Sequence, residues 1–347
     1  MRMYRWTALL AALALVVAAC AGDAEPETAE PEPEPAPEAE EEAEEEEAAP
    51  EEEPWPDEII LGLVPSQDLD KLVEDADRLG ELLSAELGIG VDAIITEDYT
   101  GLVVAMSTGQ AHIGMFGPIA LAQSMDEAGA IPILQSVRRG ASTYHTQWFT
   151  NDPDRFCETE VVMAENPEGN MMAYCNGTHE ADRGPVGESA LNNIEPGETI
   201  YFVDAASASG YYYPAIQLRE TAGLDPFTDI DAQFAGGHPN AALAVYRGDG
   251  AVGTSFDDVR NILIGDEPAI AEELVVFAWS TEIPNDGISV VPDLPQSLID
   301  AITEAFLALA ASPEGNAALH EVYEIEDLEP VDLDAVNEAR LVAESFG

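Results

Sequence analysis

The chain has 347 residues and carries 69 acidic side chains against 12 basic ones, which gives a formal net charge of −57 at pH 7. Nucleic acids and anionic lipid surfaces bind proteins through positive charge, so this composition excludes both as partners. A surface this acidic suits a protein that stays soluble at high salt.

The first twenty residues have the pattern of an export signal. Arg2 and Arg5 are followed by an apolar run over 6–17 and by two alanines before Cys20. This pattern predicts a signal peptide at 1–20. The apolar run is much shorter than the roughly 20 residues that span a bilayer, so we expect no permanent membrane helix here.

Residues 17–20, with the sequence Val-Ala-Ala-Cys, resemble the bacterial lipobox, in which the cysteine is acylated and becomes the first residue of the mature protein. The resemblance implies a lipoprotein that is anchored through Cys20 to the outer side of the cell membrane. The alternative is ordinary signal-peptide cleavage beside an incidental cysteine.

Residues 21–57 are almost only Glu, Pro and Ala, without a basic residue. Such a stretch has little to bury and repels itself, which predicts a disordered acidic stalk that lifts the folded part off the membrane. About 290 residues remain, enough for one large or two medium domains.

From residue 58 onward, strand and helix patterns alternate. Strands are predicted at 58–64, 91–95, 111–116 and 131–137. Helices are predicted at 68–87, 99–106 and 118–128, the first ending at a glycine and the last opening with a proline. This order predicts an α/β fold with a mostly parallel sheet flanked by helices on both faces.

The alternation starts again further along the chain, so two α/β lobes are expected to follow one another. Strands are predicted at 199–203 and 232–235, and helices at 210–222, 240–246, 294–311 and 332–346. The pattern does not show which lobe the last two helices cover.

Cys157 and Cys175 are the two cysteines that follow Cys20. An exported protein meets oxidising conditions, so we predict a disulfide between them, with two free buried thiols as the alternative. Their spacing fits no metal or redox motif, and the histidines share no metal-ligand spacing. We therefore expect neither a metal nor a cofactor.

Eight short motifs occur in order over about 230 residues. They are LGLVPS at 61–66, DYT at 98–100, FGP at 116–118, STY at 142–144, DAASASG at 204–210, GH at 237–238, TSFDD at 254–258 and IPND at 283–286. Together they resemble the phosphate/phosphite/phosphonate-binding proteins of ABC importers. That resemblance implies a two-lobed type II periplasmic-binding fold with a ligand cleft between the lobes.

The resemblance also implies where the lobes begin and end. A first lobe is expected over 58–145 and a second over 146–284. The second carries a cysteine-bearing insertion at 151–196, where the family has a shorter connection. Residues 285–347 are expected to form a hinge return and C-terminal helices that belong to the first lobe.

By this resemblance, the DAASASG turn holds the anion. Ser207, Ser209 and the Gly210 amide are the expected donors, because the first amides of a helix are unpaired and its dipole is positive there. Such donors need no cationic side chain, which suits a chain so poor in bases. Ala205 and Ala208 stand where the family has proline and threonine, so one hydroxyl donor is missing. N-capping of the helix is the alternative role of the serines.

Further contacts follow from the other motifs. His238 is expected to donate to the same anion, and Tyr99 and Tyr144 to offer hydroxyl groups and ring walls at the pocket edge. A structural histidine and ordinary core aromatics are the alternatives. The remaining contacts implied by the matched motifs are Phe116, Ser142 and Thr143.

Asp257, Asp258 and Asp286 are expected to lie opposite the anion donors. A carboxylate cannot stabilise a dianion, but it can accept the ligand's protons or pair with an amino group. This favours an aminophosphonate, or protonated phosphite or phosphate, over a fully charged anion. Solvated loop acids are the alternative.

The resemblance therefore implies a monomeric solute-binding protein that captures phosphate, phosphite or a phosphonate by hinge closure and delivers it to an ABC permease. An alternative is the same fold binding another small solute, such as a sulfonate, a thiamine precursor or an organic acid. An enzyme is not expected, because the sequence has no GxSxG, HExxH or P-loop motif and no Rossmann-type GxGxxG turn that follows a strand and opens a helix.

Overall fold

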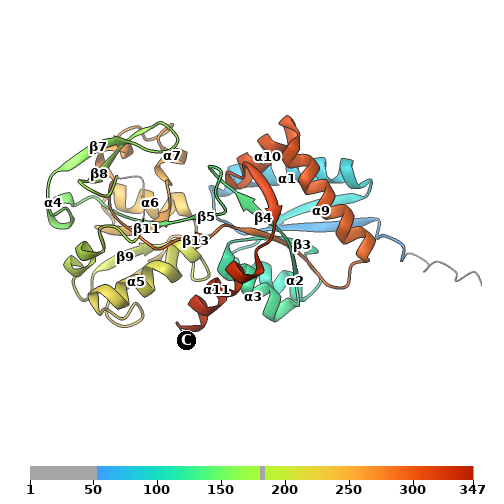
Figure 1. The fold of residues 1–347 in the computed structure, drawn as a ribbon, viewed down its shortest axis with the longest axis horizontal. Coiled ribbons are helices and arrows are strands. Elements are labelled where there is room, and N and C mark those ends of the chain that lie inside the picture. The colour runs from blue at the N-terminus through green and yellow to red at the C-terminus, as the bar shows by residue number, and fades with distance from the viewer. Residues whose placement is uncertain (1–52, 180–183, 347) are drawn as a thin grey trace, which may run out of the picture. The chain divides into compact units, whose positions relative to one another are not determined.

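The computed structural model describes residues 53–179 and 184–346. The signal peptide expected at 1–20, the lipidation site Cys20 and nearly all of the stalk expected at 21–57 lie outside these residues. In the described part, no helix combines the length and apolar character that crossing a membrane requires. The strands and helices gather around two large sheets, which define two lobes (Figure 1).

The first lobe is built on a six-stranded sheet with the strand order β15-β4-β14-β3-β1-β2. Its strands are β1 (Glu58–Leu63), β2 (Gly90–Ile95), β3 (Ile113–Phe116), β4 (Ile131–Val137), β14 (Gly287–Val290) and β15 (Asp327–Pro330). Its helices are α1 (Leu69–Leu87), α2 (Tyr99–Ser107), α3 (Pro118–Ala128), α9 (Gln296–Ala311), α10 (Pro313–Tyr323) and α11 (Leu333–Glu344). The elements predicted between residues 58 and 137 are confirmed to within two residues at each end.

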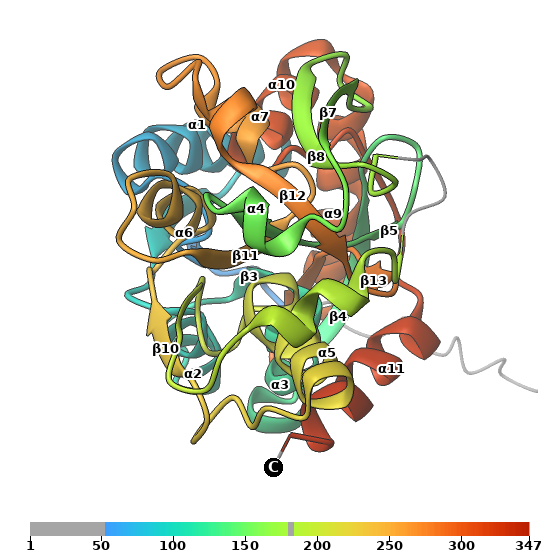
Figure 2. The same ribbon diagram turned by 90° about the vertical axis from the view of Figure 1, so that its left-hand side faces the viewer.

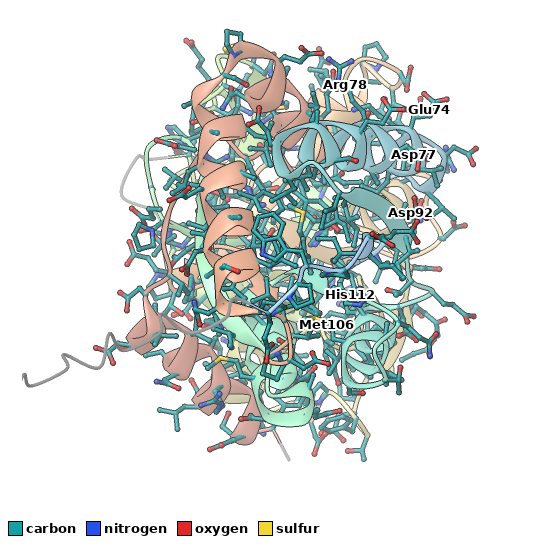
Figure 3. The ribbon with its side chains drawn as sticks, turned by 90° about the vertical axis from the view of Figure 1, so that its right-hand side faces the viewer. Glu74, Asp77, Arg78, Asp92, Met106 and His112 are labelled. Carbon is teal, nitrogen blue, oxygen red and sulfur yellow. A yellow bond between two sulfur atoms is a disulfide. The ribbon has the colours of Figure 1, made fainter. Side chains whose placement is uncertain are left out.

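Helix α1 shows how local sequence sets these boundaries. The Asp68 side chain accepts a hydrogen bond from the Lys71 amide at 3.2 Å, and Gly88 ends the helix with a left-handed φ of 73°. One face of the helix is buried against the sheet. Figure 3 shows Glu74 and Asp77 on the outer face, where the chain's excess negative charge meets solvent.

The second lobe is built on a seven-stranded sheet with the strand order β10-β9-β11-β6-β12-β8-β7. Its strands are β6 (Thr146–Thr150), β7 (Val161–Glu165), β8 (Met171–Cys175), β9 (Thr199–Phe202), β10 (Asp231–Phe234), β11 (Val252–Phe256) and β12 (Val275–Trp279). Its helical segments are α4 (Pro153–Phe156), a 3-10 helix η1 (Glu188–Asn193), a π-helical turn η2 (Ala208–Tyr212), α5 (Tyr213–Ala222), α6 (His238–Tyr246), α7 (Arg260–Leu263) and α8 (Ile270–Glu273).

The central strands of the second sheet are buried on both faces. The neighbours Trp148 and Phe149 of β6 point to opposite faces, Trp148 into a core with α5 and η1 and Phe149 into one with α6 and α8. Figure 2 looks toward this lobe and shows β12 and β11 with the helices around them. Because β12 is covered on both sides, it reads as an apolar run, Val-Val-Phe-Ala-Trp.

Two short strands connect the lobes. β5 (Thr143–Tyr144) leads into β6, β13 (Ile283–Pro284) leads into β14, and the two pair antiparallel. β6 then lies antiparallel between β11 and β12, and β14 lies antiparallel between β3 and β4. The sheets are therefore mixed, and not mostly parallel as expected. Each receives a strand that arrives from the other lobe, and each has a further antiparallel pair of its own, β15–β4 and β7–β8.

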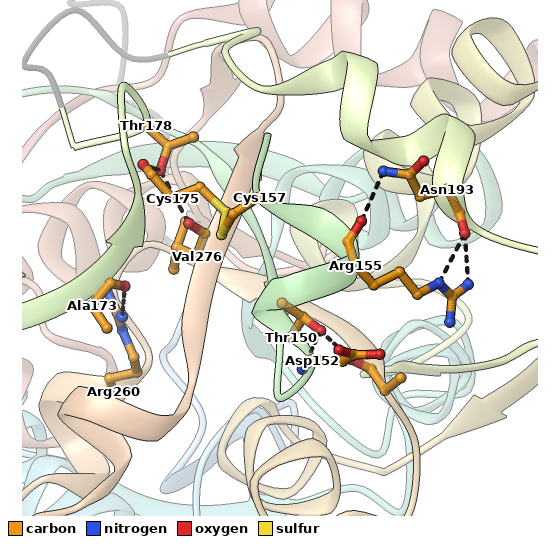
Figure 4. Close-up of a disulfide and its surroundings, with 11 residues drawn as sticks. Thr150, Asp152, Arg155, Cys157, Ala173, Cys175, Thr178, Asn193, Arg260 and Val276 are labelled. Atoms are coloured by element: carbon orange, nitrogen blue, oxygen red, sulfur yellow. Dashed lines mark hydrogen bonds between the residues drawn. A yellow bond between two sulfur atoms is a disulfide. The ribbon is translucent and has the colours of Figure 1, made fainter. Parts of the chain in front are cut away.

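Residues 151–196 supply the edge strands β7 and β8 of the second sheet. Cys157, which follows α4, and Cys175, the last residue of β8, are joined by a disulfide (Figure 4). Thr178 Oγ1 donates to the carbonyl oxygens of Cys175 and Val276 at 2.8 and 3.0 Å, which ties the turn after β8 to β12. The segment is thus an integral part of the second lobe.

Candidate functional site

A cavity of about 90 Å³ is lined by residues of both lobes. Two hydrogen bonds donated by backbone amides cross between the lobes beside it. The His238 amide donates to the Ser66 carbonyl at 3.0 Å, and the Tyr99 amide donates to Asp204 Oδ2 at 3.4 Å. The predicted site residues that line the cavity are Tyr99, Tyr144, Ser207, Ser209, His238, Asp257 and Asp286.

The turn between β9 and η2 contributes two serines, Ser207 and Ser209, to the cavity wall. Ser207 Oγ accepts a hydrogen bond from the Gly210 amide at 3.1 Å, so Ser207 caps the helix and uses the amide that was expected to bind the anion. Ser209 Oγ is buried and has no hydrogen-bond partner of standard geometry among the described residues. The Ser209 carbonyl accepts from Thr146 Oγ1 at 2.9 Å, which fixes the turn to β6.

His238 is the first residue of α6 and is 6% exposed. Its Nδ1 lies 2.8 Å from Ser255 Oγ and 3.4 Å from the Phe256 amide, which donates to it. Burial, and to a lesser extent the charge of Arg138, lower the pKa of His238 to about 3. An imidazole that is neutral and accepts at Nδ1 carries its proton on Nε2, so His238 can act as an uncharged donor.

Phenol groups form another part of the wall. Burial raises the pKa of Tyr99 and of Tyr144 well above the usual range, so both hydroxyl groups keep their protons. Asp98 accepts from the Gly101 amide at 2.6 Å and thereby sets the start of α2, which holds Tyr99. Tyr323 of α10 also lines the cavity, and its hydroxyl donates to the Val64 carbonyl at 2.7 Å.

Two arginines line the cavity, although the sequence suggested a site without cationic side chains. Arg138 Nη2 donates to Asp286 Oδ2 at 2.6 Å, and Arg139 Nη2 donates to Asp257 Oδ1 at 3.0 Å. The two predicted carboxylates that line the cavity, Asp257 and Asp286, are therefore already paired with an arginine. The two arginines were missed because they follow β4 in a turn, where nothing in the pattern marks them as site residues.

Asp258 does not line the cavity. It accepts hydrogen bonds from Nε and Nη2 of Arg260 at 2.9 and 2.7 Å, and both side chains are fully buried. Arg260 in turn donates from Nη1 to the carbonyl oxygens of Ala173, seen in Figure 4, and Leu274 at 2.7 and 2.9 Å. Asp258 is thus part of a core ion pair.

The other predicted residues that lie outside the cavity make packing contacts or hydrogen bonds within the protein. Phe116 is buried in the core of the first lobe, and Thr143 pairs with Pro284 between the lobes. The Ser142 carbonyl accepts from the Gln135 side chain and the Asn285 amide. Gly210 packs so closely on Val203 that a Cβ would overlap this side chain.

Sequence reasoning also missed Gln67 and Glu324, which line the cavity. Gln67 Oε1 is buried without a hydrogen-bond partner in the described part of the chain. Gln67 follows the end of β1, and ligands of α/β sheets gather at the carboxyl ends of strands, so its position was the one signal that could have found it. Glu324 follows α10, a helix that the sequence did not predict.

A family model described as the periplasmic phosphonate substrate-binding protein of an ABC transporter matches residues 61–336. The chain belongs to this family. Members are substrate-binding proteins that work with a transporter outside the cytoplasm.

Individual proteins that this chain resembles have related descriptions. A phosphate-import protein of Mycolicibacterium smegmatis is 24% identical over 306 residues, which cover 85% of this chain and 79% of the relative. The fold matches a binding-protein component of an ABC phosphonate transporter from Pseudomonas aeruginosa with a TM-score of 0.68 at 19% identity, covering 84% of this chain and 87% of the other. A Prochlorococcus marinus protein in complex with methylphosphonate gives a TM-score of 0.68 at 15% identity, covering 83% and 98%. The two-lobed type II periplasmic-binding fold is confirmed.

Proposed function

We propose that this chain captures phosphate, phosphite or a phosphonate between its lobes and delivers it to the permease of an ABC importer. The family match supports this, as do a relative that imports phosphate and a structural neighbour that binds methylphosphonate. One observation carries the proposal. Ser209 Oγ makes no hydrogen bond of standard geometry with a described residue, His238 Nδ1 is occupied by Ser255 Oγ and the Phe256 amide, and both residues lie at the starts of helical segments and line the same cavity.

Neutral donors can supply the required affinity. A micromolar Kd corresponds to about −8 kcal/mol, and hydrogen bonds to a charged group contribute roughly 1.5 to 3 kcal/mol each. Four donors on Ser209, His238, Tyr99 and Tyr144 supply roughly 6 to 12 kcal/mol before association costs are subtracted, and the positive ends of η2 and α6 add to this sum.

The charge of the cavity selects the form of the ligand. Five carboxylates line it against two guanidinium groups, and Glu324 makes no ion pair with any described residue. Burial raises the pKa of Glu324. A fully charged anion would be repelled by these groups. We therefore propose that the ligand is a protonated phosphate or phosphite, or an aminophosphonate whose amino group faces the carboxylates.

The proposed location follows from the N-terminal residues. Acylation of Cys20 would hold the protein as a lipoprotein on the outer side of the cell membrane, with the acidic stretch 21–57 as a spacer. Fatty-acid labelling that is present in the natural chain and lost in Cys20→Ser supports this anchor, whereas equal labelling of both chains rejects it.

Calorimetry with a panel of anions tests the ligand class. We expect binding at micromolar Kd or tighter for at least one of phosphate, phosphite, methylphosphonate and 2-aminoethylphosphonate. Ser209→Ala should weaken that binding at least tenfold, since it removes a donor. It should change the stability of the empty protein little, because this hydroxyl makes no hydrogen bond of standard geometry with a described residue and interacts only weakly with the Tyr144 hydroxyl.

Ser107→Ala, an exposed serine on α2 away from the cavity, is the matched control and should bind like the natural chain. If calorimetry shows binding of a sulfonate or an organic acid and of no phosphorus compound, the alternative that the same fold binds another small solute is favoured.

A further inference from the structure

Arg139 of the first lobe is held by two residues of the second. Arg139 Nη1 donates to Glu168 Oε1 at 2.6 Å and to the Asp257 carbonyl at 2.8 Å, while Nη2 donates to Asp257 Oδ1 at 3.0 Å. All three residues line the cavity. Arg139 belongs to the turn between β4 and β5, Glu168 to the β7–β8 hairpin, and Asp257 to the end of β11. One guanidinium group therefore joins the lobes at the cavity wall.

The hairpin tip that carries Glu168 is fixed to its own lobe. The Asn166 amide donates to the Asn170 carbonyl, and the Asn170 amide donates to Asn166 Oδ1, both at 2.9 Å. Asn261 Oδ1 accepts from the side chains of Asn166 and Asn170 at 2.8 and 2.9 Å, which ties the tip to α7. Glu168 is thus presented by a rigid support, so little conformational freedom is lost when it meets Arg139.

The turn that carries Arg139 is equally defined. Arg138 and Ala141 exchange two backbone hydrogen bonds of 3.0 Å around Arg139 and Gly140, whose φ angles are 52° and 69°. Two central residues with positive φ define a type I′ hairpin turn, in which Asn, Asp or Gly is usual. The Arg139 amide also donates to Glu326 Oε2 at 2.7 Å. An arginine is therefore held in an unfavourable backbone region, where its side chain reaches the other lobe.

The surroundings strengthen this contact relative to an ordinary surface ion pair. The side chains of Arg139 and Glu168 are 26% and 29% exposed, and that of Asp257 is 3% exposed. Partial burial reduces screening by water and salt, and the second hydrogen bond to Asp257 fixes the geometry of the guanidinium group. Hinge opening that moves the hairpin from the turn would break these bonds and leave Asp257 without its arginine.

We propose that Glu168 is a positioning residue that holds Arg139 at the cavity and joins the two lobes in the closed form without touching the solute. The apparent affinity of such a protein scales with the fraction of molecules in the binding-competent state, so an interlobe contact of this kind raises affinity for every solute by the same factor. It also slows solute release, because release requires the lobes to part. The effect on affinity rests on the proposed function, whereas the contact between the lobes does not.

The test compares Glu168→Gln with Glu165→Gln, which removes the same charge from the same hairpin. Glu165 lies outside the cavity wall and makes no ion pair with any residue that the structure describes. We expect Glu168→Gln to weaken binding of inorganic phosphate and of methylphosphonate by the same factor, about three- to tenfold, mainly through faster dissociation. Raising NaCl from low to molar concentration should shrink the difference between the natural chain and Glu168→Gln. Glu165→Gln should match the natural chain.

Small-angle scattering of the solute-free chains separates this proposal from the proposed function. The radius of gyration of Glu168→Gln should exceed that of Glu165→Gln, since fewer molecules are closed, and this comparison needs no ligand. Expansion of the empty variant with no binding of any phosphorus anion would reject the ligand class and keep the interlobe contact. Equal radii and equal dissociation rates in the two variants would overturn the proposal, and so would a loss of affinity confined to one solute, because that result would mean direct contact with the solute.

Discussion

His238 can donate a hydrogen bond without a charge, because its environment keeps the ring neutral. Its folded pKa of about 3 lies below the unfolded value of about 6.5. As pH falls through this range, the unfolded chain takes up a proton before the folded chain does, so the contribution of His238 to stability is lost between about pH 6.5 and 3. Between pH 8 and 7 the charge of His238 in the folded protein does not change, so His238 adds no pH dependence to ligand binding.

Nitrogen chemical shifts of the His238 imidazole over pH 8 to 5 check this. We expect the shifts of a neutral ring with the proton on Nε2 throughout the range. A titration midpoint near 6.5 would show that the ring is charged in the folded protein at mildly acidic pH, and the site would then bind its anion through a cation.

Among the single residues, the motif resemblance could predict those side chains whose position is set by the turn in which they lie. Ser209 and His238 sit at helix starts, so their position follows from sequence neighbours alone. Asp257 and Asp258 are adjacent, yet one pairs with Arg139 at the cavity and the other with Arg260 in the core. Sequence could not separate them, since the choice depends on partners brought by other elements.

Among the elements, α7 carries Arg260, which ties the segment after β11 to β8 and to the residue before β12. It donates to Asp258 and to the carbonyl oxygens of Ala173 in β8 and Leu274 before β12. Asp258→Ala would leave the Arg260 guanidinium group buried without its counter-charge, which costs about 3 to 5 kcal/mol. Urea unfolding should show this loss, while Asp293→Ala, an exposed acid, should stay within about 0.5 kcal/mol of the natural chain. Similar values for both variants would mean that the ion pair is not a major support of the second lobe.

Elements with strong periodicity were the ones that sequence could predict. In the first lobe, the apolar stripe and caps of α1 mark the ends of this helix, and the early strands were found to within two residues. β12 was missed although all five of its residues are buried and apolar, because a short apolar run does not distinguish a buried strand from a buried helix. α10 was missed as well, and with it Tyr323 and Glu324 of the cavity wall.

For the whole molecule, sequence predicted two α/β lobes but not the directions of all their strands. β14 lies between β3 and β4, which precede it by more than 150 residues, and its antiparallel pairing reverses the expected pattern. Such pairing is a property of the folded chain and leaves no local signal. The same exchange of strands brings β5 and β13 together between the lobes, beside the cavity that both lobes line.

A crystal structure of the protein with its tightest-binding phosphorus anion tests the central claim most directly. We expect the phosphorus oxygens to lie about 3 Å from Ser209 Oγ and His238 Nε2, with the ligand enclosed by both lobes. A ligand bound elsewhere, or a ligand in this cavity that leaves both of these donors unpaired, would contradict the account.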